Sequence, residues 1–329
     1  NILLLYLLMS SRIKAELICF ANIVPAAQSL QALKKGMIIK MRDFVITADS
    51  NCDLLEEYVK EKQIGIIPHY YDLDGVTYGD EVNLTPKEFY DRMRQGKMPT
   101  TMASNPAVIR STFQHYLNQG LDILHISFSS ALSGGCSNIV TGATEILEEY
   151  PGAKITVFDT LNASLGEGMA VMKAVALKEE GKTMDEVTAW LEEHKMDFCV
   201  LFTVDDLGHL HRGGRISKAT AIVGSMINIK PILRIDTEGH LLPLSTARGR
   251  KKSLSTICND MINNMGKYKD ASDIVCIAHG DALEDAQYLA DLIREKLPHK
   301  QILINYVSPS IGSHSGPGAI GLCFMGEKR

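Results

Sequence analysis

From Asp43 onward, short apolar runs alternate with longer amphipathic stretches, and this alternation limits the possible folds more than any other feature. Such a pattern is typical of βαβ units, in which helices connect parallel strands and cover the sheet. Runs rich in β-branched and aromatic residues lie at 44–47, 64–70, 123–128 and 155–158. The first half of the chain is therefore predicted to form a largely parallel sheet flanked by helices.

Helix starts are marked between these runs. Thr85-Pro86-Lys87-Glu88 combines a capping box with proline at the first helical position. Asn105-Pro106 repeats the cap-then-proline signal before a helix predicted to end at Gly120. Two further helices are predicted at 168–182 and 184–193.

The pattern changes near residue 196. A strand at 198–204, a hairpin of 233–235 with 240–244, and strands at 274–278 and 302–307 predict an α+β domain with a mixed sheet. A length of 329 residues suits two domains, predicted at 41–195 and 196–329. Residues 1–40 are predicted to be an extension outside the fold. Their apolar run is shorter than the ~20 residues of a membrane helix, so no stable membrane insertion is expected.

Composition excludes several classes of function. A net charge of -5 gives no general attraction for nucleic acid or anionic lipid. The seven cysteines never occur as C-x-x-C, which predicts reduced thiols in a cytoplasmic protein and no metal site. P-loop, G-x-G-x-x-G and H-E-x-x-H motifs are absent, so no cofactor is predicted.

Small polar residues follow three of the predicted strands, at 49–50, 129–135 and 159–160. Loops at the carboxyl ends of parallel strands gather at one edge of a sheet, where ligands bind. Ser133 lies at the predicted N-cap of the next helix, where free N–H groups and the helix dipole attract an anion. Serine at this position often does no more than cap the helix.

Other candidate residues lie outside that loop. Thr101 precedes the 106–120 helix and can offer a hydroxyl to the same edge, or form only a local turn. His314, in the glycine- and serine-rich turn predicted at 311–318, can donate to an anion or carry a proton. Three arginines can bind an anion or form a docking face for an acidic partner: Arg212, Arg215 and Arg248. The alternative is that they are solvent-exposed surface residues without a binding role.

The order Ser133, Asp159, His314 matches that of an α/β hydrolase triad, so a serine esterase using Ser133 and His314 is an alternative. The nucleophile elbow G-x-S-x-G is absent, because Leu132 stands where its first glycine belongs. Binding without catalysis is therefore preferred. A third hypothesis is a phosphoryl-transfer protein that binds a small phosphorylated metabolite.

Taken in order, six motifs resemble the DegV family of bacterial fatty-acid-binding proteins, which includes the FakB subunit of fatty acid kinase. The resemblance covers about residue 42 to the C-terminus. The motifs are Asp49-Ser50 with Asp53-Leu54, Pro99-Thr100-Thr101, Ser130-Ala131-Leu132-Ser133-Gly134, Asp159-Thr160 with Ser164 and Gly166, Arg212-Gly213-Gly214-Arg215-Ile216-Ser217, and Gly312-Ser313-His314-Ser315-Gly316-Pro317-Gly318.

This resemblance implies a two-domain, non-catalytic lipid carrier that holds a long-chain fatty acid in a tunnel between its domains. By position, it implies that Thr101 and Ser133 contact the carboxylate, with His314 as a third contact. It also implies that Arg212, Arg215 and Arg248 face a kinase subunit that phosphorylates the bound fatty acid to an acyl phosphate. The chain departs from the family at Met102 and at Gly135-Cys136, which leaves the preference for chain length and saturation open.

Overall fold

The computed structural model describes residues 42–80, 82–217, 228–327 and 329. The predicted extension at 1–40 lies outside the described residues. Phe44–Arg329 forms one compact unit. The strands of the two larger sheets come from opposite sides of residue 195, but the predicted division into domains 41–195 and 196–329 remains a prediction.

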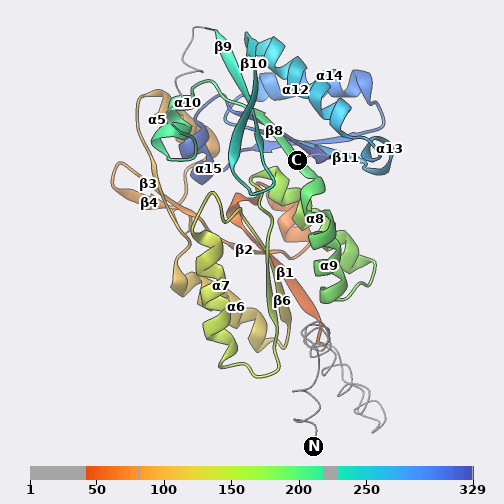
Figure 1. Ribbon diagram of the computed structural model, residues 1–329. Coiled ribbons are helices and arrows are strands. Elements are labelled where there is room, and N and C mark those ends of the chain that lie inside the picture. Colours follow the sequence, from red (N-terminus) through yellow and green to blue (C-terminus); the bar gives the residue numbers. More distant parts are fainter. Residues whose placement is uncertain (1–41, 81, 218–227, 328) are drawn as a thin grey trace, which may run out of the picture. The chain divides into compact units, whose positions relative to one another are not determined.

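The first sheet has four strands in the order β2-β1-β6-β7, and each neighbouring pair is parallel (Figure 1). The predicted parallel sheet of the first half is thus confirmed. Its strands are β1 (Phe44–Asp49), β2 (Gly65–Ile67), β6 (Asp122–Ser127) and β7 (Ile155–Asp159).

A second sheet of six strands has the order β10-β9-β8-β13-β11-β12. Only β11 and β12 pair in parallel, and the other neighbours are antiparallel, which confirms the predicted mixed sheet. β9 and β10 form the predicted hairpin. The strands are β8 (Phe198–Thr203), β9 (Ile229–Ile235), β10 (Leu241–Arg248), β11 (Ile274–His279), β12 (Gln301–Tyr306) and β13 (Ile320–Met325).

A third sheet, of three antiparallel strands, was not predicted. It contains β3 (Tyr70–Leu73), β4 (Val76–Tyr78) and β5 (Thr100–Met102) in the order β4-β3-β5. The single strand predicted at 64–70 is wrong, because this stretch divides between β2 and β3. Pro68 has no N–H group to continue the ladder, and the His69 N–H donates to Ser50 Oγ at 2.9 Å instead of to a neighbouring strand.

The capping signals set the helix starts as expected. Thr85 forms a complete capping box with Glu88, and the Asn105 side chain accepts the Ala107 N–H. The helix predicted at 168–182 begins and ends three residues earlier. The helices are η1 (Ser50–Cys52), α4 (Glu56–Glu61), α5 (Pro86–Arg94), α6 (Pro106–Asn118), α7 (Gly135–Leu147), α8 (Leu165–Glu179), α9 (Met184–His194), η2 (Lys195–Asp197), α10 (Leu207–Arg212), α12 (Arg250–Asn264), α13 (Tyr268–Ala271), α14 (Leu283–Lys296) and α15 (Pro309–Ser315).

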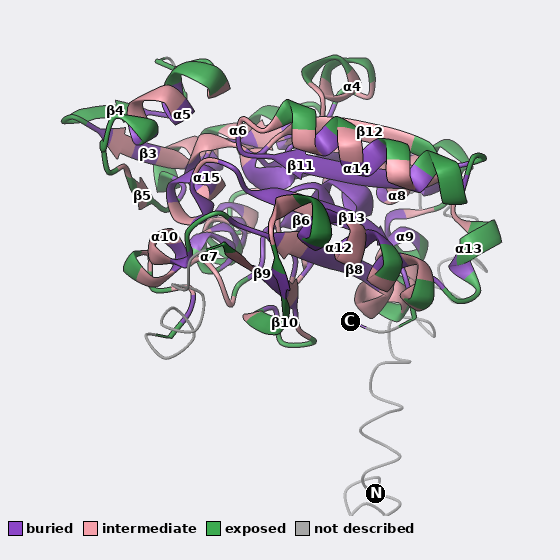
Figure 2. Ribbon diagram, turned by 90° about the horizontal axis from the view of Figure 1, so that it is seen from above, coloured by how far each residue is buried: buried purple, intermediate pink, exposed green. Residues whose placement is uncertain are grey.

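Helix α8 lies between the two larger sheets, and its apolar side chains share one core with β1, β6, β8, β11 and β13. The face of the four-stranded sheet that is turned away from α8 packs against α6 and α7. The far face of the six-stranded sheet is covered by α12 and α14. The central strands are therefore almost entirely buried, as Figure 2 shows.

The six cysteines in the described ranges are all buried and none of them forms a disulfide bond, in agreement with the expected reduced thiols. Among the described helices, none is long and apolar enough to cross a membrane.

Candidate functional site

One cavity of about 240 Å³ contains all three residues predicted to contact an anion. Its wall comes from the six-stranded sheet, from the segments that follow β1, β2, β6 and β7, from β5, and from α10 and α15. Most of the wall is apolar, and its larger apolar residues are Met102, Phe128, Leu132, Val200, Phe202, Leu210, Ile235, Leu241, Val307, Ile311 and Ile320. The polar side chains on the wall are Asn51, His69, Thr101, Ser133, Ser164, Arg215, Ser310, His314 and Ser315.

Thr101 and His314 are far apart in the sequence and meet in this cavity. Thr101 comes from β5, and His314 from α15, which packs against β5. The Thr101 hydroxyl lies 2.9 Å from His314 Nε2. Residues 309–315 form a helix, so the prediction of an irregular turn at 311–318 is wrong over most of its length.

His314 is neutral near pH 7. Burial, and then the positive charge of Arg215, lower the pKa of His314 to about 4. A neutral imidazole carries one N–H, and a proton on the buried Nδ1 would have no acceptor, whereas a proton on Nε2 has the Thr101 oxygen within 2.9 Å. We assign the proton to Nε2 on these grounds. His314 then donates to the Thr101 oxygen, which leaves the Thr101 proton available to a ligand.

Ser133 lies immediately before α7, although the predicted N-cap is wrong by one residue. The helix begins at Gly135 and its N-cap is Gly134. The Ser133 hydroxyl oxygen still accepts the Gly135 N–H at 3.1 Å, because the loop that leaves β6 turns directly into the helix. As the oxygen accepts, the hydroxyl proton is free to donate to an anion in the cavity.

The three arginines predicted to dock a partner occupy different surroundings. Arg215 is half-buried on the cavity wall and donates to the backbone carbonyls of Leu132 and Gly213. Arg212 is exposed, with its guanidinium 3.9 Å from an Asp206 oxygen. Arg248 is exposed at the end of β10. The cavity wall, as far as it is described, contains no other lysine or arginine than Arg215.

The hydrolase-like order of Ser133, Asp159 and His314 does not correspond to a triad in space. Asp159 Oδ1 accepts the N–H groups of Ser130 and Leu161. His314 Nε2 pairs with Thr101, and no carboxylate lies within hydrogen-bonding distance of Nδ1 among the described residues. In a Ser-His-Asp triad the carboxylate orients the imidazole, and here that contact is missing.

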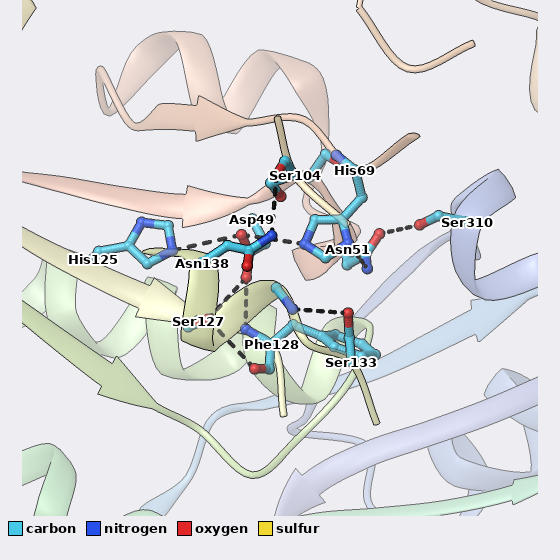
Figure 3. Close-up of polar contacts among 12 residues, drawn as sticks. Asp49, Asn51, His69, Ser104, His125, Ser127, Phe128, Ser133, Asn138 and Ser310 are labelled. Carbon is cyan, nitrogen blue, oxygen red and sulfur yellow. Dashed lines mark hydrogen bonds and ion pairs between the residues drawn. The ribbon is translucent and has the colours of Figure 1, made fainter. Parts of the chain in front are cut away.

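A buried polar cluster behind the Ser133 loop was not predicted. Asp49, at the end of β1, accepts the Phe128 N–H at 2.8 Å and the Ser127 hydroxyl at 3.1 Å (Figure 3). Its other oxygen lies 3.4 Å from His69 Nε2 and 3.5 Å from His125 Nε2. Burial opposes ionisation of Asp49, but the two imidazoles together hold its pKa well below the usual range. The cluster fixes the end of β6, from which the Ser133 loop begins.

Asn51 connects this cluster to the cavity wall. Its Nδ2 lies 3.1 Å from His69 Nδ1, and its Oδ1 accepts the Ser310 hydroxyl near the start of α15 (Figure 3). The same oxygen accepts the Ser308 hydroxyl at 3.4 Å. A Cβ on Gly135 would lie 2.9 Å from His69 Cε1 and 3.4 Å from Ser133 Oγ. Only glycine at 135 therefore lets the His69 ring pack beside Ser133.

A second carboxyl group anchors α15. Asp53 accepts the Ser308 N–H at 3.1 Å and the Ser164 hydroxyl. Burial raises the pKa of Asp53 to about 7, although both hydrogen bonds favour its ionised form. A sequence signal for these residues existed in the polar stretch 49–53, directly after a buried strand, and in His125, a polar residue inside an apolar run.

The protein has a mixed α/β fold, and its cavity combines a mostly apolar wall with a few hydroxyl groups, imidazoles and one guanidinium. The family model for uncharacterised proteins of the DegV family matches residues 43–327. A DegV domain-containing protein from Clostridium perfringens is 41% identical over 291 residues, which cover 88% of this chain and 99% of that protein. The chain belongs to the DegV family.

Two solved structures are similar over the same region. A fatty-acid-binding DegV family protein from Thermus thermophilus has a TM-score of 0.75 and 31% identity, over 87% of this chain and 100% of that one. DegV from Bacillus subtilis, a fatty acid binding protein, has a TM-score of 0.75 and 27% identity, with the same coverage. Proteins of this family therefore bind fatty acids.

Proposed function

We propose that this protein is a carrier that binds one long-chain fatty acid, such as palmitate or oleate, in the cavity described above. The carboxylate accepts hydrogen bonds from the Thr101 and Ser133 hydroxyl groups, and His314 orients Thr101 from behind. The acyl chain lies against the apolar wall. The observation that carries the proposal is the meeting of Thr101, Ser133 and His314 in one mostly apolar cavity.

The division between polar and apolar wall fits the energetics of such a ligand. Each buried CH₂ contributes roughly 0.8 kcal/mol, so some fifteen methylenes contribute on the order of 12 kcal/mol before ordering costs. A buried carboxylate without partners would cancel much of this gain. Arg215, on the same wall, supplies a compensating positive charge, whereas the neutral His314 does not.

Two comparisons support the proposal. The Thermus thermophilus and Bacillus subtilis proteins both bind fatty acids, and the alignment covers the full length of each of those two proteins. At 31% and 27% identity, the likeness extends to sequence as well as fold.

The carrier is proposed to be non-catalytic and to need no cofactor. An esterase using Ser133 and His314 is the alternative, and it lacks a carboxylate to orient the imidazole. A fluorophosphonate probe separates the two functions, because an esterase labels covalently at Ser133 and a carrier does not label. A small phosphorylated metabolite as ligand would leave the apolar part of the wall without a partner.

We further propose that a kinase subunit receives the bound fatty acid in the cytoplasm and converts its carboxylate to an acyl phosphate, which would serve lipid transport or fatty acid metabolism. Arg212 and Arg248 are exposed and suit an acidic partner. Arg215 is held at the cavity by the Leu132 carbonyl, so it is suited to the ligand as well as to the partner surface predicted for it.

The decisive experiment is mass spectrometry of a denaturing extract of protein purified from a bacterial host. A carrier releases a fatty acid, whereas the third hypothesis predicts a phosphate ester. Delipidated protein should then bind palmitate or oleate in a direct titration, and failure to bind either would refute the carrier function.

Substitutions locate the carboxylate. Ser133→Ala and Thr101→Ala should each weaken palmitate binding by about 10-fold or more, because each removes a hydrogen bond to a charged group. Ser137→Ala, on the exposed side of α7, and Thr100→Ala, on the opposite face of β5, are matched controls. Unchanged affinity in Ser133→Ala would remove Ser133 from the site.

A further inference from the structure

Ser315 is a buried polar residue on the cavity wall that the contacts described so far do not use. It is the last residue of α15, it is 8% exposed, and its hydroxyl has no hydrogen-bond partner. A buried hydroxyl without a partner typically costs 1–3 kcal/mol. Such an orphan group in a ligand cavity indicates that the ligand supplies the missing partner.

The same helix provides a direct contrast. Ser313 is also 8% exposed, but its hydroxyl donates to the Pro309 carbonyl at 2.8 Å, four residues earlier, as helical serines commonly do. Ser315 does not make the corresponding bond to Ile311. Since Ser315 lines the cavity and Ser313 does not, the two serines differ in what their hydroxyl groups face.

Ser315 lies next to His314 on the cavity wall. It follows His314 directly, so their Cα atoms are about 3.8 Å apart. His314 Nε2 is bonded to Thr101, and both residues line the cavity. The Ser315 hydroxyl therefore faces the same cavity as Thr101 and His314, from the neighbouring position on α15.

A carboxylate can accept about four hydrogen bonds through its two oxygens. Thr101 and Ser133 provide one hydroxyl donor each, so lone pairs remain to be satisfied inside an apolar wall. We propose that the Ser315 hydroxyl donates a hydrogen bond to the fatty acid carboxylate, as a third hydroxyl contact that holds both oxygens in place. This inference rests on the proposed carrier function and specifies which groups recognise the head of the ligand.

The test compares Ser315→Ala with Ser313→Ala by titration of delipidated protein with palmitate and with hexadecanol. Hexadecanol has a single oxygen and no charge, so it needs fewer donors than a carboxylate. Ser315→Ala is expected to weaken palmitate binding by about 10-fold to 100-fold and hexadecanol binding by much less. Ser313→Ala should leave palmitate affinity within about 3-fold of wild type, since its hydroxyl bonds within the helix.

Two further variants guard against a simple folding defect. Ser315→Cys keeps the size of the side chain but is a weak donor, and it should lose palmitate affinity while unfolding at the wild-type temperature. Ser315→Thr keeps the hydroxyl and should retain most of the affinity. Equal losses for palmitate and hexadecanol, or wild-type palmitate affinity in Ser315→Ala, would overturn the role of Ser315. Absence of palmitate binding in the wild-type protein would instead overturn the carrier function itself.

Discussion

A methyl group added at Gly213 should displace the His314 ring and so test its contact with Thr101 in the proposed head-group site. A Cβ at Gly213 would lie 2.1 Å from His314 Nδ1 and 3.0 Å from Cε1 of the same ring. Gly213 has φ -71°, which alanine adopts freely, so Gly213→Ala introduces a clash without backbone strain. The imidazole ring must therefore move, and its 2.9 Å contact with Thr101 must lengthen or break.

The expected magnitude follows from that contact. Without the Nε2–H donor, Thr101 no longer has a fixed orientation toward the carboxylate, and a hydrogen bond to a charged group contributes about 1.5–3 kcal/mol. Palmitate affinity should fall by roughly 10-fold to 100-fold. Isothermal titration of delipidated protein measures this change, and thermal unfolding should show that Gly213→Ala remains folded.

Two comparisons make the result specific. Gly134 also lines the cavity at a negative φ, but a methyl group there has no atom within 4 Å and leaves the His314 ring in place, so Gly134→Ala should reduce affinity less than Gly213→Ala. In a His314→Ala background, Gly213→Ala should have little further effect, because the atom that it displaces is gone. Wild-type affinity in the single variant, or fully additive losses in the double variant, would refute the assigned contact between Gly213, His314 and Thr101.

Three other results are expected. Burial raises the pKa of Asp53 to about 7, so the stability that its neutral form provides is complete below about pH 4 and is lost as the pH rises through 7. Urea unfolding should show that the free energy of unfolding falls by about 4 kcal/mol between these pH values. In Asp53→Asn this part of the pH dependence should disappear. A Cβ on Gly321 meets only Ala278 within 4 Å, at 3.8 Å for the nearest atom, so Gly321→Leu should fill the cavity and weaken binding of stearate more than of myristate in parallel titrations. Arg212→Glu with Arg248→Glu should abolish acyl phosphate formation by a kinase subunit and leave palmitate affinity unchanged; normal turnover would remove both arginines from the docking face.

Periodicity and capping predicted most of the fold. The positions of β1, β6 and β7 and the hairpin of β9 and β10 follow from local patterns, because each can be recognised from residues close together in the sequence. The order of the strands does not, since β1 pairs with β6 across 78 positions, as Thr47 does with His125. The three-stranded sheet does not, since β5 pairs with β3 across a helix and its three residues carry no clear strand signal. The break at Pro68 could have been recognised from the missing N–H alone.

The site was predicted only where one residue has a local reason for its position. Ser133 could be placed from the helix that follows it, while the pairing of Thr101 with His314 bridges 213 positions and no local pattern contains it. Arg215 could not be assigned to the inside or the outside, because that depends on how α10 packs against α15. The cluster around Asp49 was missed for a similar reason: its partners lie on β6 and just after β2, which adjoin β1 only in the folded sheet.

The position of β13 has a consequence for how such a protein matures on the ribosome. This strand follows all the other described strands in the sequence, yet it lies in the middle of the six-stranded sheet, between β8 and β11. Its residues Ile320, Gly321 and Cys323 form part of the cavity wall. During synthesis, β8 and β11 each have one unpaired edge, the edge that later pairs with β13, until β13 leaves the exit tunnel. The cavity wall is thus completed by the last of the described strands to be synthesised, so a ligand can be enclosed only after β13 has joined the sheet.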